Sequence, residues 1–280
     1  MSAPLTLPHV LNIAHRGARS LAPENTLAAA RKALEVGADM WELDIRMTAD
    51  GELIVLHDST LERTSNVRDI FPDRKPWLVH EFSLDDIRLL DFGSWFEEQD
   101  PFGQIGAGVV MKSELATYAA EPAPTLREAL AFTLEHNWRV NLELKDLSKN
   151  PGHSQVVAKV VSLVQELDMV DLVLISSFHQ DYLAEVRKID HKYATALLVS
   201  KSNPHAAELL RHLGVQAYHL RKTAVPSTDI ALLNRLGYAV HVWNVNDKKT
   251  MQRLVKAGVS GIFTDFPQVL ASLIATYAVG

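Results

Sequence analysis

Residues 11–59, LNIAHRGARSLAPENTLAAARKALEVGADMWELDIRMTADGELIVLHDS, carry the pattern that decides the fold. Polar residues that are uncommon at strand ends stand there at the ends of short apolar runs. Glu42 and Asp44 are two residues apart, so on an extended chain both carboxylates point to one side and their apolar neighbours to the other. An ordinary core strand would not turn two acids inward. The pattern therefore predicts a strand at the mouth of a barrel whose outside is covered by helices.

The rest of the chain alternates strand and helix patterns. Apolar runs that predict strands are centred near residues 12, 43, 140, 174, 197, 218, 241 and 262, and a helical pattern follows each of them. Eight such units favour a closed (β/α)8 TIM barrel over an open doubly wound sheet. No GxGxxG motif follows any strand, which weakens a dinucleotide-binding alternative. Gly37 is expected to end the first helix, and residues 49–51 to turn the chain into a hairpin.

The strand–helix alternation is lost from about residue 59 to residue 122. A structureless loop of this length is uncommon in a compact domain, so we expect an insertion after strand two with some structure of its own. Residues 1–280 are thus expected to form a single barrel domain with one insertion. Because the insertion leaves the barrel just after His57, we expect it over the mouth, where it would influence the choice of alcohol group.

Composition narrows the classes of partner. The formal net charge of −6 leaves no basic excess to neutralise a phosphate backbone, so no nucleic acid partner is expected. The chain has no cysteine, which excludes a disulfide framework, thiolate chemistry and a zinc–sulfur site. The amino-terminal segment has no basic stretch followed by an apolar one, and no apolar run approaches the length of a membrane span. We therefore expect a soluble, cytoplasmic protein without stable membrane insertion.

A series of short motifs resembles the glycerophosphodiester phosphodiesterase family. The motifs are HRG (15–17), PENT (23–26), ELD (42–44), HD (57–58), NLELK (141–145), SSF (176–178), VWNVN (242–246) and GIFTDFP (261–267). They follow the order of the family across almost the whole chain. The family commonly has Thr where Asn244 stands and Asp where Ser260 stands, and we expect neither departure to touch a proposed catalytic group. The resemblance implies hydrolysis of glycerophosphodiesters to sn-glycerol 3-phosphate and an alcohol.

Three carboxylates are expected at the barrel mouth, from Glu42 and Asp44 on one strand and from Glu143 on the next. Their charges repel one another unless a positive charge lies between them. Oxygen ligands favour a hard cation, so Mg²⁺, Ca²⁺ or Mn²⁺ is expected and zinc is less suitable. The resemblance independently implies that these three acids bind one divalent cation. The alternative is a layer of salt bridges with Arg16 and Lys145.

The resemblance also implies that Arg16 and Lys145 contact the substrate phosphate. The planar fork of arginine suits two phosphate oxygens, and lysine acts as a point charge. Taken alone, either residue could instead be a structural partner of a carboxylate. Trp243 and Phe178 are the expected apolar contacts of the glycerol or alcohol group, with packing as the alternative for each.

His15 and His57 are the proposed acid–base pair, because histidine titrates near neutral pH. Asp58 could orient the ring of His57 or cap a turn. Among the other histidines, His179 is a weaker candidate for the mouth, and His241 is interpreted as a packed interior residue or a group behind the site. The PENT motif is interpreted as a helix start and therefore as mainly structural.

Two other functions are considered beside metal-assisted phosphodiester hydrolysis. A related barrel phospholipase acting on lyso- or inositol phospholipids would need an apolar rim facing a membrane, which Trp77 and Trp95 in the insertion could supply. A non-catalytic phosphate-binding barrel would be marked by loss of a histidine or an acid, whereas the full set is present. For the hydrolase, we hypothesise that the glycerol 2-hydroxyl attacks first and that water opens the resulting cyclic phosphate.

Overall fold

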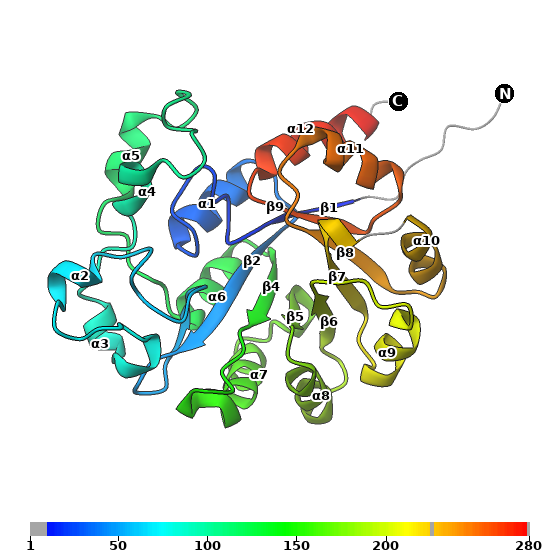
Figure 1. Ribbon diagram of the computed structural model, residues 1–280, viewed down its shortest axis with the longest axis horizontal. Helices are drawn as coiled ribbons and strands as arrows, with labels where there is room; N and C mark the ends of the chain where they lie inside the picture. Colours follow the sequence, from blue (N-terminus) through cyan, green and yellow to red (C-terminus); the bar gives the residue numbers. More distant parts are fainter. Residues whose placement is uncertain (1–9, 225–226, 279–280) are drawn as a thin grey trace.

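The computed structural model describes residues 10–224 and 227–278, so most of the amino-terminal segment considered from the sequence lies outside the described residues. Eight parallel strands close into a barrel, with β1 paired to both β2 and β9 (Figure 1). This arrangement confirms the predicted (β/α)8 TIM barrel. The barrel strands are β1 (Leu11–Ala14), β2 (Met40–Met47), β4 (Arg139–Leu144), β5 (Val173–Ser177), β6 (Ala194–Val199), β7 (Ala217–Arg221), β8 (Ala239–Trp243) and β9 (Gly261–Thr264).

Helices cover the outside of the barrel, as the alternating pattern predicts (Figure 1). They are α1 (Leu27–Glu35), α6 (Leu126–Glu135), α7 (Val156–Glu166), α8 (Gln180–Ile189), α9 (Ala206–Leu213), α10 (Ser227–Arg235), α11 (Lys248–Lys256) and α12 (Pro267–Ala278). Helix α1 begins after Thr26, whose hydroxyl accepts the N–H of Ala29, and Gly37 follows its end with a φ of +78°. This left-handed backbone suits glycine and confirms its predicted place. No helix among the described residues is long and apolar enough to cross a membrane.

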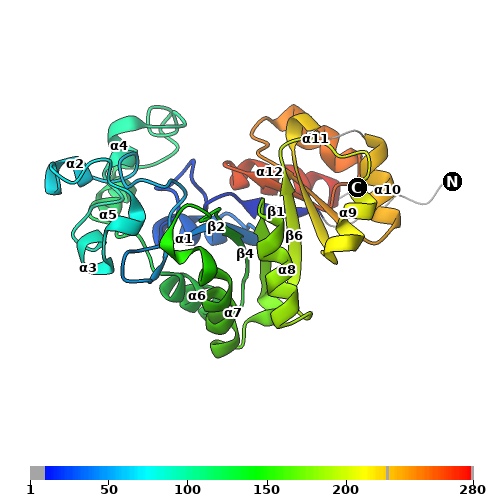
Figure 2. The same ribbon diagram turned by 60° about the horizontal axis from the view of Figure 1, so that its bottom comes forward.

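The predicted hairpin is present, because β3 (Leu53–Val55) pairs antiparallel with β2. After it, residues 59–122 form a group of short helices that lies to one side of the barrel, beside α1 (Figures 1 and 2). These are α2 (Val67–Ile70), α3 (Leu84–Ile87), α4 (Trp95–Gln99) and α5 (Lys112–Tyr118). Trp77 and Trp95 are 3% and 8% exposed, so neither provides the apolar rim that a membrane-facing phospholipase would need.

The interior of the barrel changes character along its axis. Near the amino ends of the strands it is filled by an apolar interior cluster, which we define as Ile13, Met40, Leu174, Ala196, Ala217 and Phe263. Side chains on a strand face the same side at every second residue, so the next inward position lies two residues closer to the carboxyl end. In five of these six strands that position is polar: His15, Glu42, Ser176, His219 and Asp265. The polar layer therefore lies directly on an apolar base.

Candidate active site

The carboxyl ends of the strands surround one cavity with about 450 Å³ of empty space, including its mouth. Its lining is formed by His15, Arg16, Glu42, His57, Asn141, Glu143, Lys145, Ser176, Phe178, Leu198, His219, Trp243, Asn244 and Phe263. Nine residues are expected in the site from the sequence, and eight of them line this cavity. The ninth, Asp44, is fully buried and contacts both Arg16 and Lys145.

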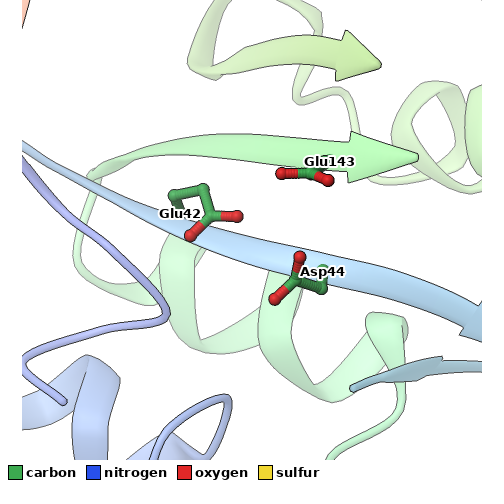
Figure 3. Close-up of side chains that lie close together, drawn as sticks. All are labelled: Glu42, Asp44 and Glu143. Carbon is green, nitrogen blue, oxygen red and sulfur yellow. The ribbon is translucent and has the colours of Figure 1, made fainter. Parts of the chain in front are cut away.

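The three acids converge as expected. Glu42 and Asp44 project from β2 and Glu143 from β4, with their carboxylates directed into one space (Figure 3). One oxygen of each lies within 4.8 Å of the others. Strand pairing explains this geometry, because Asp44 is directly opposite Glu143 in the parallel register. The arrangement supplies an all-oxygen ligand set on a rigid part of the barrel.

The electrostatics of the three acids are unequal. Burial, together with the charges of Asp44 and Glu143, raises the pKa of Glu42 well above its usual range. Burial also raises the pKa of Glu143. Burial alone would raise the pKa of Asp44 too, but Lys145 and Arg16 outweigh it and hold that pKa well below its usual range. Two of the three carboxylates are thus penalised in their charged form.

The acids fit a hard divalent cation. Lys145 Nζ lies 2.6 Å from Glu143 and 3.2 Å from Asp44, so part of the alternative salt-bridge layer is also present. Glu42, however, accepts the backbone N–H of Arg16 through Oε2 at 2.8 Å, and its Oε1 is buried without a hydrogen-bond partner among the described residues. A buried carboxylate oxygen without a partner is costly, and a cation between the acids would supply one.

The PENT motif belongs to the site more closely than its interpretation as a helix start indicates. Asn25 donates from Nδ2 to Asp44 Oδ2 at 2.8 Å. Glu24 accepts hydrogen bonds from Arg16 at 2.8 Å and from Arg63 at 2.6 Å, and also pairs with Arg19 at 2.8 Å. The interpretation as mainly structural is therefore incomplete, because this loop orients both an acid and the arginine of the site.

The backbone conformation also indicates that the PENT loop is part of the site. Arg16 and Asn25 have φ angles of +57° and +59°, in the left-handed region that residues other than glycine rarely adopt. The Asn25 N–H donates to the carbonyl of Arg16 at 3.0 Å, which ties the two positions together. Strained backbone of this kind is retained where the surrounding contacts hold it, often at functional sites.

His15 is held by a chain of polar contacts. Its Nδ1 lies 2.6 Å from Asp265 Oδ1, and Asn246 donates to Asp265 Oδ2 at 2.6 Å. Burial lowers the pKa of His15 to about 4, with Arg16 acting in the same direction and Asp265 opposing it. The ring is therefore neutral near pH 7, and contact with Asp265 favours the proton on Nδ1.

Asn244 also touches this ring. Its Nδ2 lies 2.5 Å from His15 Nδ1 and 3.1 Å from Nε2, so the expectation that this position touches no proposed catalytic group is wrong. The reason is barrel closure: β8, which ends just before Asn244, is separated from β1 only by β9. Ser260 lies at the other end of β9, where its hydroxyl accepts the N–H of Val240.

His57 has a similar carboxylate partner but a more open setting. Its Nδ1 lies 2.6 Å from Asp58 Oδ1, and Asp58 in turn accepts from Arg63 Nε at 2.6 Å. Of the two roles considered for Asp58, the contact with the ring is present. The side chain of His57 is 32% exposed, compared with 12% for His15, so it is more accessible to solvent.

Of the remaining candidate residues, two line the cavity and two do not. Phe178 and Trp243 meet edge to face at 5.8 Å and line one side of the cavity. His179 stacks on Tyr182, with ring centroids 4.4 Å apart, and is not among the cavity-lining residues. His241 is a buried interior residue, as one interpretation has it, and its Nδ1 lies 3.0 Å from Nε2 of His219.

Comparisons with known proteins agree with this geometry. A sequence profile described as the Glycerophosphoryl diester phosphodiesterase family matches residues 15–269. A glycerophosphodiester phosphodiesterase of Caldanaerobacter subterraneus is 32% identical over 94% of this chain and 97% of its own length. One from Bacillus subtilis is 30% identical over 95% and 86%. A solved phosphodiesterase of Oleispira antarctica, in complex with the product sn-glycerol-3-phosphate, has a TM-score of 0.80 at 27% identity and covers 96% of this chain and 97% of its own.

Proposed function

Because the chain belongs to the glycerophosphoryl diester phosphodiesterase family and is a phosphoric diester hydrolase, we propose that it splits glycerophosphodiesters into sn-glycerol 3-phosphate and an alcohol with one divalent cation and two histidines. The observation that carries the proposal is that two carboxylate-bound histidines line one cavity beside a cluster of three acids, two of which line it as well. A membrane-facing phospholipase is less well supported, because Trp77 and Trp95 are buried.

Glu42, Asp44 and Glu143 would hold the cation, with Mg²⁺, Ca²⁺ and Mn²⁺ as the candidates that match oxygen ligands. When bound, the cation supplies positive charge that stabilises negative charge on the phosphate oxygens. Arg16 and Lys145 add fixed positive charge at the same place, and both are held by neighbouring carboxylates. These positive groups offset the negative charge of the diester, which would otherwise repel a nucleophile.

The two histidines transfer the protons that the reaction requires, one from the nucleophile and one to the alcohol oxygen, which is a poor leaving group without a proton. His15, neutral and held through Nδ1 by Asp265, presents Nε2 to accept the proton of the nucleophile. His57, held by Asp58, donates a proton to the oxygen of the departing alcohol. In the second half of the reaction the two exchange these roles.

The nucleophile in the first half is the glycerol 2-hydroxyl, which lies next to the phosphorus and gains a large effective concentration. His15 takes its proton, the new P–O bond forms, and the bond to the alcohol breaks as His57 protonates that oxygen. His57 then takes a proton from water, which attacks the cyclic phosphate and forms a new P–O bond. The bond between phosphorus and the glycerol 2-oxygen breaks as His15 returns its proton to that oxygen. A diester without the 2-hydroxyl should therefore react much more slowly, and its hydrolysis at the normal rate would exclude the cyclic route.

The experiment that tests the function measures products from glycerophosphocholine, glycerophosphoethanolamine, glycerophosphoglycerol and glycerophosphoinositol, with and without chelator. We expect sn-glycerol 3-phosphate as the common product in every diester that is cleaved, and loss of activity in chelator. Release of a phosphorylated alcohol with free glycerol would contradict the proposal. The single-domain organisation with its insertion and the cytoplasmic location stay predictions, which limited proteolysis and cell fractionation would check.

A further inference from the structure

The cavity has a polar floor that the proposed reaction does not use. Asn141 lies on β4 two residues before Glu143, and His219 lies on β7 two residues after Ala217 of the apolar interior cluster. Both side chains line the cavity, yet their exposed fractions are only 1% and 0%. Asn141 is thus one step of strand alternation deeper than Glu143 and directly opposite Glu42, and His219 lies in the same polar layer as Glu42.

Each of these two residues has one satisfied and one unsatisfied polar atom. Asn141 donates from Nδ2 to Ser176 Oγ at 2.9 Å, whereas its Oδ1 is buried without a hydrogen-bond partner among the described residues. His219 contacts His241 through Nε2 at 3.0 Å, and its Nδ1 is likewise buried and unpartnered. Buried polar groups are nearly always paired, so two unpaired atoms on residues that line one cavity point to a ligand.

The chemistry of the pair indicates which ligand group fits. Burial lowers the pKa of both rings, that of His241 to about 4, so the two histidines are neutral near pH 7 and share one proton across their contact. Depending on which ring donates, Nδ1 of His219 is a donor or an acceptor. A hydroxyl satisfies it in either case. When His241 donates to His219, Nδ1 of His219 is the donor, and one hydroxyl can accept from it and donate its single proton to Asn141 Oδ1. A phosphate or carboxylate, which only accepts, would leave Asn141 without a partner.

The position of the floor indicates which hydroxyl this is. Below the floor the barrel is filled by the apolar interior cluster, so there is room there only for a small unit. In glycerophosphodiesters the glycerol unit is constant and the leaving alcohol varies. With the phosphate near Arg16 and Lys145, the terminal hydroxyl of glycerol is the group farthest from phosphorus. We propose that Asn141 and His219 form the subsite for this terminal hydroxyl, an inference that rests on the proposed function.

The first test needs no variant. Binding of sn-glycerol 3-phosphate to the wild-type protein with its cation is compared by titration calorimetry with binding of the matching propane-1,2-diol phosphate, which lacks only the terminal hydroxyl. We expect the analogue to bind about tenfold more weakly, the usual worth of one or two neutral hydrogen bonds. Equal affinities would overturn the subsite. This readout does not depend on turnover, so a failure to hydrolyse diesters would count against the proposed function separately.

A matched pair of variants then assigns the effect to one nitrogen. The amide nitrogen of glutamine can stand near Nε2 of a histidine, and that of asparagine near Nδ1. His219→Gln should keep the contact with His241 and lose the preference for the terminal hydroxyl, whereas His219→Asn should keep most of the preference. An equal loss of affinity for both ligands in His219→Gln would show a structural role only and overturn the assignment. Thermal unfolding of each variant checks that the fold is retained.

Discussion

The two ends of the barrel interior are built on the same strands but solve different problems. The apolar interior cluster fills the amino end with side chains such as Ile13 and Leu174, which need no partner beyond their neighbours. Two residues further along, the carboxyl end holds charged and polar groups, among them Glu42 with its unpartnered Oε1. The first layer is stable in itself, whereas the second is complete only with a ligand.

This difference teaches how the fold separates stability from chemistry. Apolar packing fixes the strands, and the strands fix the register that brings Asp44 opposite Glu143. The free-energy cost of burying charged groups is confined to the polar layer near the mouth, where these groups are needed for the reaction. Substitutions in the apolar layer should therefore affect mainly stability, and substitutions in the polar layer should affect mainly catalysis.

The largest expected effect is on catalysis in the polar layer. His15→Ala should lower kcat by about 10²- to 10⁴-fold, the usual contribution of general acid–base catalysis, while the melting temperature stays within a few degrees. His136→Ala is the control, because this exposed ring hydrogen-bonds to the carbonyl of Phe132 and packs on the ring of the same residue, outside the cavity lining. Steady-state kinetics on one diester checks both, and a His15→Ala enzyme with normal kcat would remove this residue from the mechanism.

The next effect is on stability in the apolar layer. Leu174→Ala should lower the free energy of unfolding by about 2–5 kcal/mol, because it leaves a cavity in a packed interior. We expect kcat of the folded enzyme to stay within about twofold, since the register at the mouth is held by many other strand contacts. Urea unfolding and kinetics at low temperature measure the two. A large loss of kcat in the fully folded variant would break the separation between layers.

These layers also differ in how far the sequence predicts them. The eight strands follow from local apolar runs, and strand alternation alone places Glu42, Asp44 and Glu143 on inward faces. The partners of the catalytic groups do not follow in this way. Asp265 is 250 positions from His15, and only closure of the barrel brings them together. Asn244 was missed for the same reason.

The polar floor and the PENT loop show a second limit. His219 stands in an otherwise apolar strand, and its pattern does not distinguish a packed histidine from one with a free nitrogen. Glu24 and Asn25 match a helix start equally well, and their contacts with Arg16 and Asp44 depend on a left-handed turn that the sequence does not reveal. The motif GIFTDFP did contain Asp265, so the resemblance carried a signal that residue spacing did not.

A third effect concerns acid sensitivity of the polar layer. The pKa of buried His241 is lowered to about 4 from 6.5. The unfolded chain therefore binds this proton at higher pH than the folded one, and stability is lost as pH falls from about 6.5 to about 4. This group should account for about 3 kcal/mol of that loss. In His241→Gln, the free energy of unfolding should fall by about 3 kcal/mol less between pH 6.5 and pH 4 than in the wild type. An equal fall in both proteins would contradict the burial effect.

The smallest effect concerns charge in the absence of a cation. Since burial raises the pKa of Glu143, its charged form is penalised. Glu143→Gln should therefore raise the free energy of unfolding in chelator. The same variant should lose the stabilisation that a saturating cation gives the wild type. Chemical unfolding with and without cation measures both, and a less stable variant in chelator would show that the pairing with Lys145 dominates.

The central claim, that Glu42, Asp44 and Glu143 form the cation site on which hydrolysis depends, has one direct test. Metal-stripped protein is titrated with Mg²⁺, Ca²⁺ or Mn²⁺ in a calorimeter, and samples taken along the titration are assayed for release of sn-glycerol 3-phosphate. We predict one high-affinity cation per chain, with activity rising in proportion to occupancy, and no such binding in Glu143→Gln. Full turnover by the stripped protein in excess chelator would contradict the claim.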